Sequence, residues 1–254
     1  MTTDQRKQVL VLGGSSGIGR AIAQRFAQEG WRVIIASNDG ENAALVCQDL
    51  PGDGHCWFLL DVRYDAQLDN FADWLKNRQV SIDVLINSIG VSESFKVLDT
   101  DFAGWNNVLE VMLYGTVKSC RAFVPFITEG GRIIHITSIH YNRVEKGSSA
   151  YGMAKAAITQ FTRSLALELA PKSILSNTIA PGFVDTPMSV KRNGENELNT
   201  EWFYDNYIKY DHLPLKRAAK PEEIAGVAYF LAGPDSSYMT GSVITVDGGL
   251  TITF

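Results

Sequence analysis

The sequence contains few cysteines, no long apolar run and no block of like charges. Its three cysteines, Cys47, Cys56 and Cys120, show no CxxC spacing, which is unlike a disulfide framework or a zinc site, so no metal is expected. No apolar stretch approaches the ~20 residues that a membrane-spanning helix requires. Residues 1–8 are polar and lack the apolar region of a signal peptide, so we expect a cytoplasmic protein.

The charge balance is mildly acidic. Lys and Arg number 23 against 28 Asp and Glu, for a net charge of -5. This balance argues against nucleic acid or a membrane surface as a partner, and a small-molecule substrate is expected instead. With 254 residues and 45% hydrophobic content, the chain can bury one sizeable core, so we expect a single domain over residues 1–254.

Short apolar runs alternate with segments of helical periodicity. This alternation predicts an α/β fold with a doubly wound parallel sheet, Rossmann-like, in three α/β/α layers. The expected strands are residues 9–12, 33–36, 57–60, 83–86, 132–137, 174–179 and 243–246. The expected helices are residues 18–29, 41–50, 65–78, 102–126 (as one or two helices), 150–169 and 222–232.

Residues 187–213 depart from the alternation. The segment is polar at first and then rich in aromatic residues, and it follows a Pro-Gly turn. Two interpretations remain open, a small helical lid over a pocket and an ordinary packed helical insertion. The aromatic residues are Trp202, Phe203, Tyr204, Tyr207 and Tyr210.

A glycine-rich turn joins the first expected strand to the first expected helix. Glycines in this position permit a tight turn and a close approach of the backbone to a pyrophosphate. The N-terminus of the following helix supplies N–H donors and a favourable dipole. The turn therefore predicts a dinucleotide site, with cofactor-binding residues Gly13, Ser15, Ser16, Gly17, Ile18 and Gly19.

Tyr151 and Lys155 are four residues apart on an expected helix, so they share one face. A free tyrosine has a pKa near 10, and a neighbouring ammonium lowers that pKa by stabilising the phenolate. Tyr151 is then suited to exchange a proton with a carbonyl or alcohol oxygen. Ser138, which follows the expected strand at residues 132–137, is positioned to hold that oxygen. The predicted catalytic residues are Ser138, Tyr151 and Lys155.

The GxxxGxG turn and the spacing of Ser138, Tyr151 and Lys155 together resemble the short-chain dehydrogenase/reductase family over essentially the whole chain. The resemblance implies an enzyme that transfers a hydride between NAD(P)(H) and a carbonyl/alcohol pair. It implies that Asp61 and Val62 contact the adenine, and that Asn87 and Gly90 belong to the cofactor-binding motif after the fourth strand. It also implies that the nicotinamide, near Tyr151 and Lys155, is contacted by Pro181, Gly182, Val184 and Thr186.

Four residues in these motifs differ from the family pattern. Leu12 replaces a threonine before the first glycine, and Ser88 and Ile89 interrupt the motif that contains Asn87. Met112 replaces an asparagine that holds a water in a proton relay. Either Asn106 or Asn107 substitutes for it, or the relay differs, or catalysis is slow. We expect a working enzyme because Ser138, Tyr151 and Lys155 are retained, and the alternative is a nucleotide-binding regulator with weak or no turnover.

Cofactor preference depends on the end of the second strand. NAD-preferring members carry an acidic residue there to bind the ribose hydroxyls, whereas this sequence has Ser37 and Asn38. Neither side chain repels a 2′-phosphate, so NADP is favoured over NAD. An arginine at the place of Asn38, found in many NADP-preferring members, is absent, and Asp39 lies close enough to complicate the assignment.

His140 follows Ser138 in a Ser-x-His arrangement that resembles some sugar and polyol dehydrogenases of the family. The expected substrate contacts are Ser138, His140 and Tyr151, and Arg143 and Glu145 offer further polar contacts. A packed loop histidine is the other interpretation of His140. The alternative substrate is a 3-oxoacyl-type ketone whose apolar tail lies under the aromatic segment.

Family members are dimers or tetramers, and the resemblance favours a homotetramer.

Overall fold

A parallel β-sheet forms the centre of the molecule, and its strands coincide with the apolar runs of the sequence. In the computed structural model, which describes residues 6–91, 94–98, 101–191 and 193–253, the sheet has seven strands in the order β3-β2-β1-β4-β5-β6-β7. The strands are β1 (Gln8–Leu12), β2 (Arg32–Ser37), β3 (Cys56–Leu59), β4 (Ile82–Asn87), β5 (Ile127–Ile136), β6 (Leu175–Pro181) and β7 (Val243–Val246).

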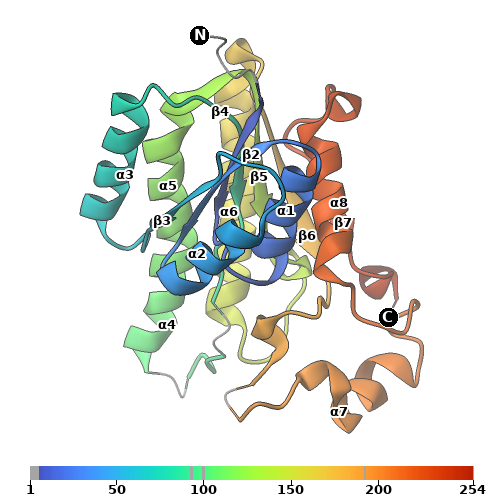
Figure 1. Cartoon of the computed structure of the whole chain (residues 1–254). Coiled ribbons are helices and arrows are strands. Elements are labelled where there is room, and N and C mark those ends of the chain that lie inside the picture. The colour runs from blue at the N-terminus through green and yellow to red at the C-terminus, as the bar shows by residue number, and fades with distance from the viewer. Residues whose placement is uncertain (1–5, 92–93, 99–100, 192, 254) are drawn as a thin grey trace.

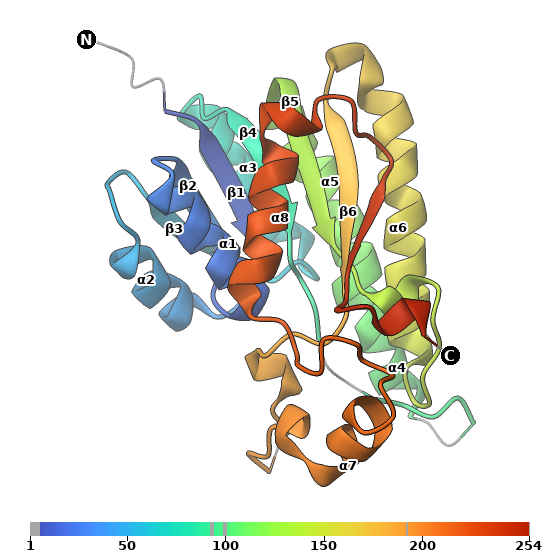
Figure 2. The same cartoon turned by 90° about the vertical axis from the view of Figure 1, so that its right-hand side faces the viewer.

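Helices cover both faces of the sheet, as Figures 1 and 2 show. One face is covered by α1 (Gly17–Gln28), α2 (Gly40–Asp49) and α8 (Pro221–Ala232). The other is covered by α3 (Asp65–Asn77), α5 (Gly115–Phe123) and α6 (Ser149–Leu169). The predicted doubly wound α/β fold with three layers is therefore confirmed.

The central strand β1 illustrates why this fold follows from the sequence. Val9 and Val11 pack into the hydrophobic cluster under α1 and α8, whereas Leu10 and Leu12 pack into the cluster under α3 and α5. All four side chains are at most 1% exposed. Successive side chains of a strand point to opposite faces, so a strand buried on both faces must be apolar at every position.

Two segments differ in detail from the prediction. β5 begins at Ile127 instead of residue 132, because an irregularity in its pairing with β4 accommodates additional residues. The helical stretch at residues 102–126 consists of α4 (Phe102–Leu109), a π-helical turn (Glu110–Tyr114), α5 and a 3₁₀ turn (Val124–Phe126). Met112 is part of this π-helical turn.

Residues 187–213 form a group of short helical turns beyond the carboxyl ends of the strands (Figures 1 and 2). They include 3₁₀ turns at Pro187–Ser189 and Glu197–Asn199, the short helix α7 (Glu201–Phe203) and a π-helical turn at Tyr204–Ile208. This group therefore lies over the end of the sheet at which ligands bind in open parallel sheets. Within the described residues, no helix combines the length and the hydropathy needed to cross a membrane.

Candidate active site

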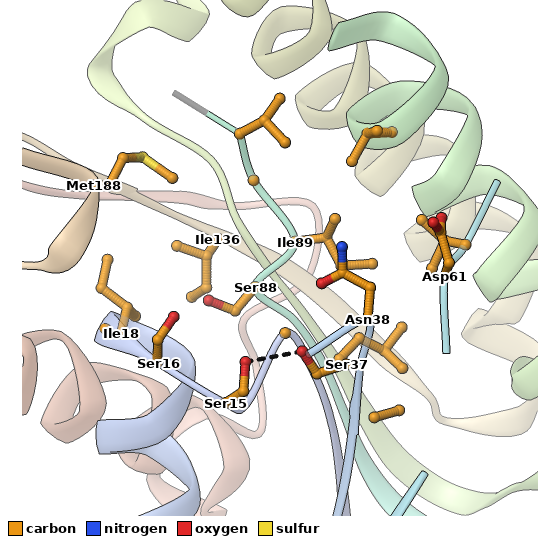
Figure 3. Close-up of a pocket in the computed structure, with 18 of the residues that line it drawn as sticks. Ser15, Ser16, Ile18, Ser37, Asn38, Asp61, Ser88, Ile89, Ile136 and Met188 are labelled. Carbon is orange, nitrogen blue, oxygen red and sulfur yellow. Dashed lines mark hydrogen bonds between the residues drawn. The ribbon is translucent and has the colours of Figure 1, made fainter. Parts of the chain in front are cut away.

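A cavity of about 330 Å³ opens where the strand order reverses, between β1 and β4. It is lined by the glycine turn after β1, by residues at and after the ends of β2 and β3, and by the loop after β4. Figure 3 shows Ser15, Ser37, Asn38, Asp61 and Ser88 arranged around this space. A crevice at such a reversal is the usual position of a dinucleotide in this class of sheet.

At two positions of the glycine turn, Gly13 and Gly19, a side chain would not fit. Gly13 has φ +76°, and a Cβ atom there would lie 2.8 Å from the carbonyl oxygen of Ser88. A Cβ atom on Gly19 would lie 2.1 Å from the carbonyl oxygen of Gly13, so Gly19 permits α1 to pack directly on the turn. The turn therefore depends on glycine for conformation at Gly13 and for close packing at Gly19.

The N-terminus of α1 faces the cavity through Ser16, Gly17 and Ile18. In α1, which is described over its whole length, the first turn contains no acidic residue, and the N-cap residue Ser16 makes no capping hydrogen bond through its side chain. The first N–H groups of a helix lack partners within the helix, and the helix dipole favours negative charge there. This end of α1 is therefore suited to a pyrophosphate.

The end of β2 places hydroxyl groups at the cavity wall. The Oγ atoms of Ser15 and Ser37 are 2.8 Å apart, and this is the hydrogen bond drawn in Figure 3. Asp39 lies outside the lining residues. Its carboxylate accepts a hydrogen bond from the backbone N–H of Asn42 at 3.1 Å and caps α2. Asp39 therefore acts as a helix cap here, and the wall beside Ser37 is uncharged.

Arg63 is a cavity residue that the sequence reasoning missed. Its guanidinium forms an ion pair with Asp61 at 2.6 Å and donates to Asn107 Oδ1 at 3.3 Å. The hydrogen bonds from Arg63 lower the pKa of Asp61, which stays ionised. The sequence feature that could have identified Arg63 is its positive charge, two residues after Asp61. Arg63 thus links the end of β3 to α4 across one end of the cavity.

Ser138, Tyr151 and Lys155 meet between this cavity and a second one. Tyr151 lines both cavities, Lys155 lines the first and Ser138 lines the second. Lys155 is 3% exposed, and its Nζ donates to the carbonyl oxygen of Ile136 at 2.9 Å. The same Nζ lies 5.4 Å from the centre of the Tyr151 ring. The structure thus brings the three predicted catalytic residues together.

The protonation of this trio differs from the expectation in one respect. Burial raises the pKa of Tyr151, and a hydrogen bond with Ser138 offsets this rise only in part. Burial also lowers the pKa of Lys155 to about 7. The expected lowering of the Tyr151 pKa by a lysine ammonium was therefore wrong for this structure, because desolvation of the buried phenol dominates. Tyr151 holds its proton at neutral pH.

The second cavity, of about 680 Å³, lies beside Tyr151 on the side of the β5–α6 loop. His140 lies at its inner end, with its ring 5.5 Å from the Tyr151 ring and nearly perpendicular to it. The Nε2 atom of His140 is 3.5 Å from a carboxylate oxygen of Glu145. Burial lowers the pKa of His140, so its ring is neutral at pH 7. We call this space the substrate cavity.

The segment at residues 187–213 forms the opposite wall of the substrate cavity. Trp202, Phe203 and Tyr207 pack on one another or on Phe183, with Tyr207 edge-on at 4.6 Å from the Phe183 ring, whereas Tyr204 and Tyr210 are exposed. Of the five aromatic residues at 202–210, only Tyr207 lines the cavity. The residues that this wall presents are Met188, Ser189, Glu197, Leu198, Asn206, Tyr207 and His212.

Most of the predicted cofactor residues line the first cavity. These are Gly13, Ser15, Ser16, Gly17, Ile18, Ser37, Asn38, Asp61, Val62, Gly90, Tyr151, Lys155 and Thr186. Pro181, Gly182 and Val184 line the substrate cavity instead, together with Ser138, His140 and, again, Thr186. Gly19 and Asn87 line neither. Asn87 donates to Thr116 Oγ1 at 3.0 Å and accepts from the Ile89 N–H at 3.1 Å, which fixes the loop after β4.

Met112 lies beneath the site and does not line either cavity. It is fully buried, packs with Val108, Ala150 and Ala154, and its carbonyl oxygen accepts from Thr116 Oγ1 at 2.6 Å. Asn107 does line the first cavity, but its side chain accepts a hydrogen bond from Arg63. The position of Met112 is therefore a packing position between α6 and the π-helical turn.

The three cysteines are free thiols. Over the ranges that the structure describes, no three His, Cys, Asp or Glu side chains gather as a metal site would require. The acid/base trio and the glycine turn are the candidate catalytic and cofactor-binding groups of the described residues.

Known sequences are similar to this chain over nearly its whole length. The sequence model of a family described as Enoyl-(Acyl carrier protein) reductase matches residues 13–251. A 3-oxoacyl-[acyl-carrier-protein] reductase from Chlamydia trachomatis is 36% identical over 253 residues, covering 96% of this chain and 97% of that protein. Carbonyl reductase family member 4 from Danio rerio is 32% identical over 244 residues, covering 96% and 97%.

Solved structures agree with the sequences. The ligand-free aldohexose dehydrogenase of Thermoplasma acidophilum superposes with a TM-score of 0.84 at 30% identity, over 98% of this chain and 95% of that one. A structure from Brucella melitensis, described as a short-chain dehydrogenase/reductase of the glucose/ribitol dehydrogenase type, gives a TM-score of 0.87 at 28% identity, over 96% of each chain.

Proposed function

The chain belongs to the short-chain dehydrogenase/reductase family, whose members are NAD(P)-dependent oxidoreductases acting on CH–OH groups, and from that premise we propose that its substrate is a sugar or polyol. The observation that carries this proposal is the polar lining of the substrate cavity next to Tyr151. His140, Glu145, Glu197 and Asn206 offer hydrogen-bonding groups from both walls. A hydroxylated substrate can satisfy such groups, whereas an apolar chain leaves them unpaired at a cost.

We propose that the first cavity binds NADP as the preferred cofactor and NAD as the weaker one. Gly13, Gly19 and the uncapped N-terminus of α1 suit a pyrophosphate. Ser15, Ser37 and Asn38 offer uncharged polar groups to a ribose 2′-phosphate. In this proposal Asp61 and Val62 contact the adenine, and Thr186, which lines both cavities, and Val184, which lines the substrate cavity, contact the nicotinamide. When bound, the nicotinamide supplies or accepts the hydride.

In this proposal the chain's own residues move and hold the proton. Tyr151 is protonated at neutral pH and donates its proton to the substrate oxygen during carbonyl reduction. Ser138 lies within hydrogen-bond distance of Tyr151 and holds the same substrate oxygen by a hydrogen bond. Lys155, whose Nζ lies beside the Tyr151 ring, restores charge balance when the phenolate forms. The pKa of Lys155 near 7 permits it to gain or lose a proton around neutral pH.

A second candidate is a 3-oxoacyl-type ketone reductase. The similarity to a curated 3-oxoacyl-[acyl-carrier-protein] reductase favours it. The aromatic segment itself gives an acyl tail little cover, because only Tyr207 of the aromatic residues at 202–210 lines the substrate cavity. Other apolar surface there is supplied by Phe183, Met188, Leu198 and Leu250. A nucleotide-binding regulator is a third candidate, motivated by Met112 at the usual asparagine position.

A screen of substrate and cofactor pairs tests the proposal. Sugars and polyols are compared with β-keto thioesters, each with NADP(H) and NAD(H), in an absorbance assay for the reduced nicotinamide. We expect turnover with at least one sugar or polyol, higher kcat/KM with NADP than with NAD, and loss of turnover in Tyr151→Phe with unchanged cofactor affinity. Turnover of thioesters alone would support the second candidate, and cofactor binding with no turnover of any compound would support the third.

We also propose a cytoplasmic homotetramer built from single-domain subunits, with residues 187–213 acting as a lid. The three free thiols suit a reducing compartment. On α6, Met153 is 54% exposed and Leu167 is 80% exposed, which suits burial against another copy. Light scattering on the purified protein measures the assembly, and protease protection of residues 187–213 by substrate and cofactor tests the lid.

A further inference from the structure

Two carboxylates face each other across the substrate cavity, and the catalytic scheme above uses neither. Glu145 comes from the β5–α6 loop, and Glu197 begins a 3₁₀ turn in the segment at residues 187–213. Both line the substrate cavity. Glu145 is linked to the reacting end only through His140, whose ring lies between it and Tyr151. Glu145 therefore lies beyond His140 as seen from Tyr151, away from the transferred hydride.

The carboxylate pair lacks compensating charge. Burial raises the pKa of Glu145, and burial followed by the charge of Glu145 raises the pKa of Glu197. The negative charges of both carboxylates contribute, after burial, to a Tyr207 pKa of about 12. Lys191 only partly offsets the effect on Glu197, and Lys191 itself pairs with Glu195 at 3.2 Å. The neutral ring of His140 gives Glu145 no counter-charge.

Two cations also line this cavity, so their positions matter. The Arg143 guanidinium donates to the carbonyl oxygen of Thr251, at the C-terminal side of the cavity. Lys146 is exposed at the cavity edge. Neither lowers the pKa of either carboxylate. Within the described part of the chain, the acceptors of the carboxylate pair are therefore available to a bound molecule.

We propose that Glu145 and Glu197 are specificity-determining residues that accept hydrogen bonds from donors at the far end of the substrate. The substrate carries hydroxyl or ammonium groups there, and a phosphate or carboxylate at that end is rejected by like charge. Hydrogen bonds to an ionised carboxylate are stronger than neutral ones, and an anion placed beside two carboxylates is repelled. Water partly screens this repulsion at Glu145, whose side chain is 41% exposed. This inference rests on the proposed sugar or polyol activity.

The test compares matched compounds that differ in charge at one end. Tetroses, pentoses, hexoses and the corresponding alditols are assayed beside their terminal phosphates and their amino analogues. For the wild type we expect kcat/KM for the phosphates to be at least about tenfold below that for the parent compounds. Glu145→Gln and Glu197→Gln should raise KM for the parents several-fold with little change in kcat, and should narrow the gap to the phosphates.

The control variant is Glu201→Gln, which changes an exposed glutamate of the same segment that does not line the cavity. It should keep the wild-type ratios. If Glu197→Gln raises KM more for the amino analogues than for the parent compounds, ammonium is the recognised donor. If it raises KM equally for both, hydroxyl is the recognised donor. Equal use of phosphates and parents by the wild type, or unchanged ratios in both cavity variants, overturns the inference.

Failure of the proposed function is distinguishable. If no compound is turned over, binding to the enzyme–NADPH complex is measured by calorimetry with the same panel. Tighter binding of parents or amino analogues than of phosphates, lost in Glu145→Gln and Glu197→Gln, supports the carboxylate pair as a specificity element. Equal binding, or no binding of any member, overturns it.

Discussion

Lys155 gives the sharpest prediction, because its burial should reduce folding stability in a pH-dependent way. Its pKa is lowered by burial from 10.5 to about 7 in the folded chain. Between these values the unfolded chain binds more protons, so the stability contributed at this site rises with pH. A single group with these two pKa values destabilises the fold by about 4 kcal/mol at pH 7 and by about 1 kcal/mol at pH 9.5.

Substitution Lys155→Met removes this titration while keeping an unbranched side chain. It also leaves the Ile136 carbonyl without its donor, a pH-independent cost of about 1–3 kcal/mol. We therefore expect Lys155→Met to be about 1–3 kcal/mol more stable than the wild type at pH 7, because the relief exceeds the cost. At pH 9.5 it should be equally or less stable, since the difference shrinks by about 3 kcal/mol.

Urea unfolding at both pH values, without cofactor, measures this difference, because bound cofactor would stabilise the two proteins unequally. The control is Lys172→Met, which changes an exposed lysine just beyond α6. A Lys155→Met difference that stays constant from pH 7 to pH 9.5, after subtraction of the control, would refute the argument that burial destabilises the charged lysine.

Three further predictions concern the proton donor, the glycine turn and the cofactor. Because burial raises the pKa of Tyr151, alcohol oxidation should rise about tenfold per pH unit below that pKa; a flat pH–rate profile of kcat/KM between pH 7 and pH 9 would contradict it. Gly19→Ala should cost several kcal/mol in thermal unfolding, because its Cβ meets backbone at 2.1 Å. Gly226→Ala, in a helix with open space around the site, should gain about 0.4–1 kcal/mol. Ser37→Asp should shift the ratio of kcat/KM values about tenfold or more toward NAD, since a carboxylate there repels a 2′-phosphate; an unchanged ratio would place that phosphate elsewhere.

The fold was predictable because its information is local. Runs such as residues 9–12 are apolar at every position, which only a strand buried on both faces requires, and the alternation with helical segments then implies a parallel sheet. The glycine turn was readable for the same reason, since Gly13 lies in a conformation that other residues rarely adopt. The spacing of Tyr151 and Lys155 fixed their common face before any contact was known.

Only the tertiary structure decided the electrostatics, because burial and neighbours come from distant parts of the chain. The raised pKa of Tyr151 and the lowered pKa of Lys155 follow from the burial of these two side chains of α6 in the folded chain, which no local pattern encodes. Arg63 meets Asn107 across 44 positions of sequence, and Glu145 faces Glu197 only because the 187–213 segment folds back over the cavity. Desolvation and long-range charge are properties of the folded arrangement, so they could not be predicted from the sequence.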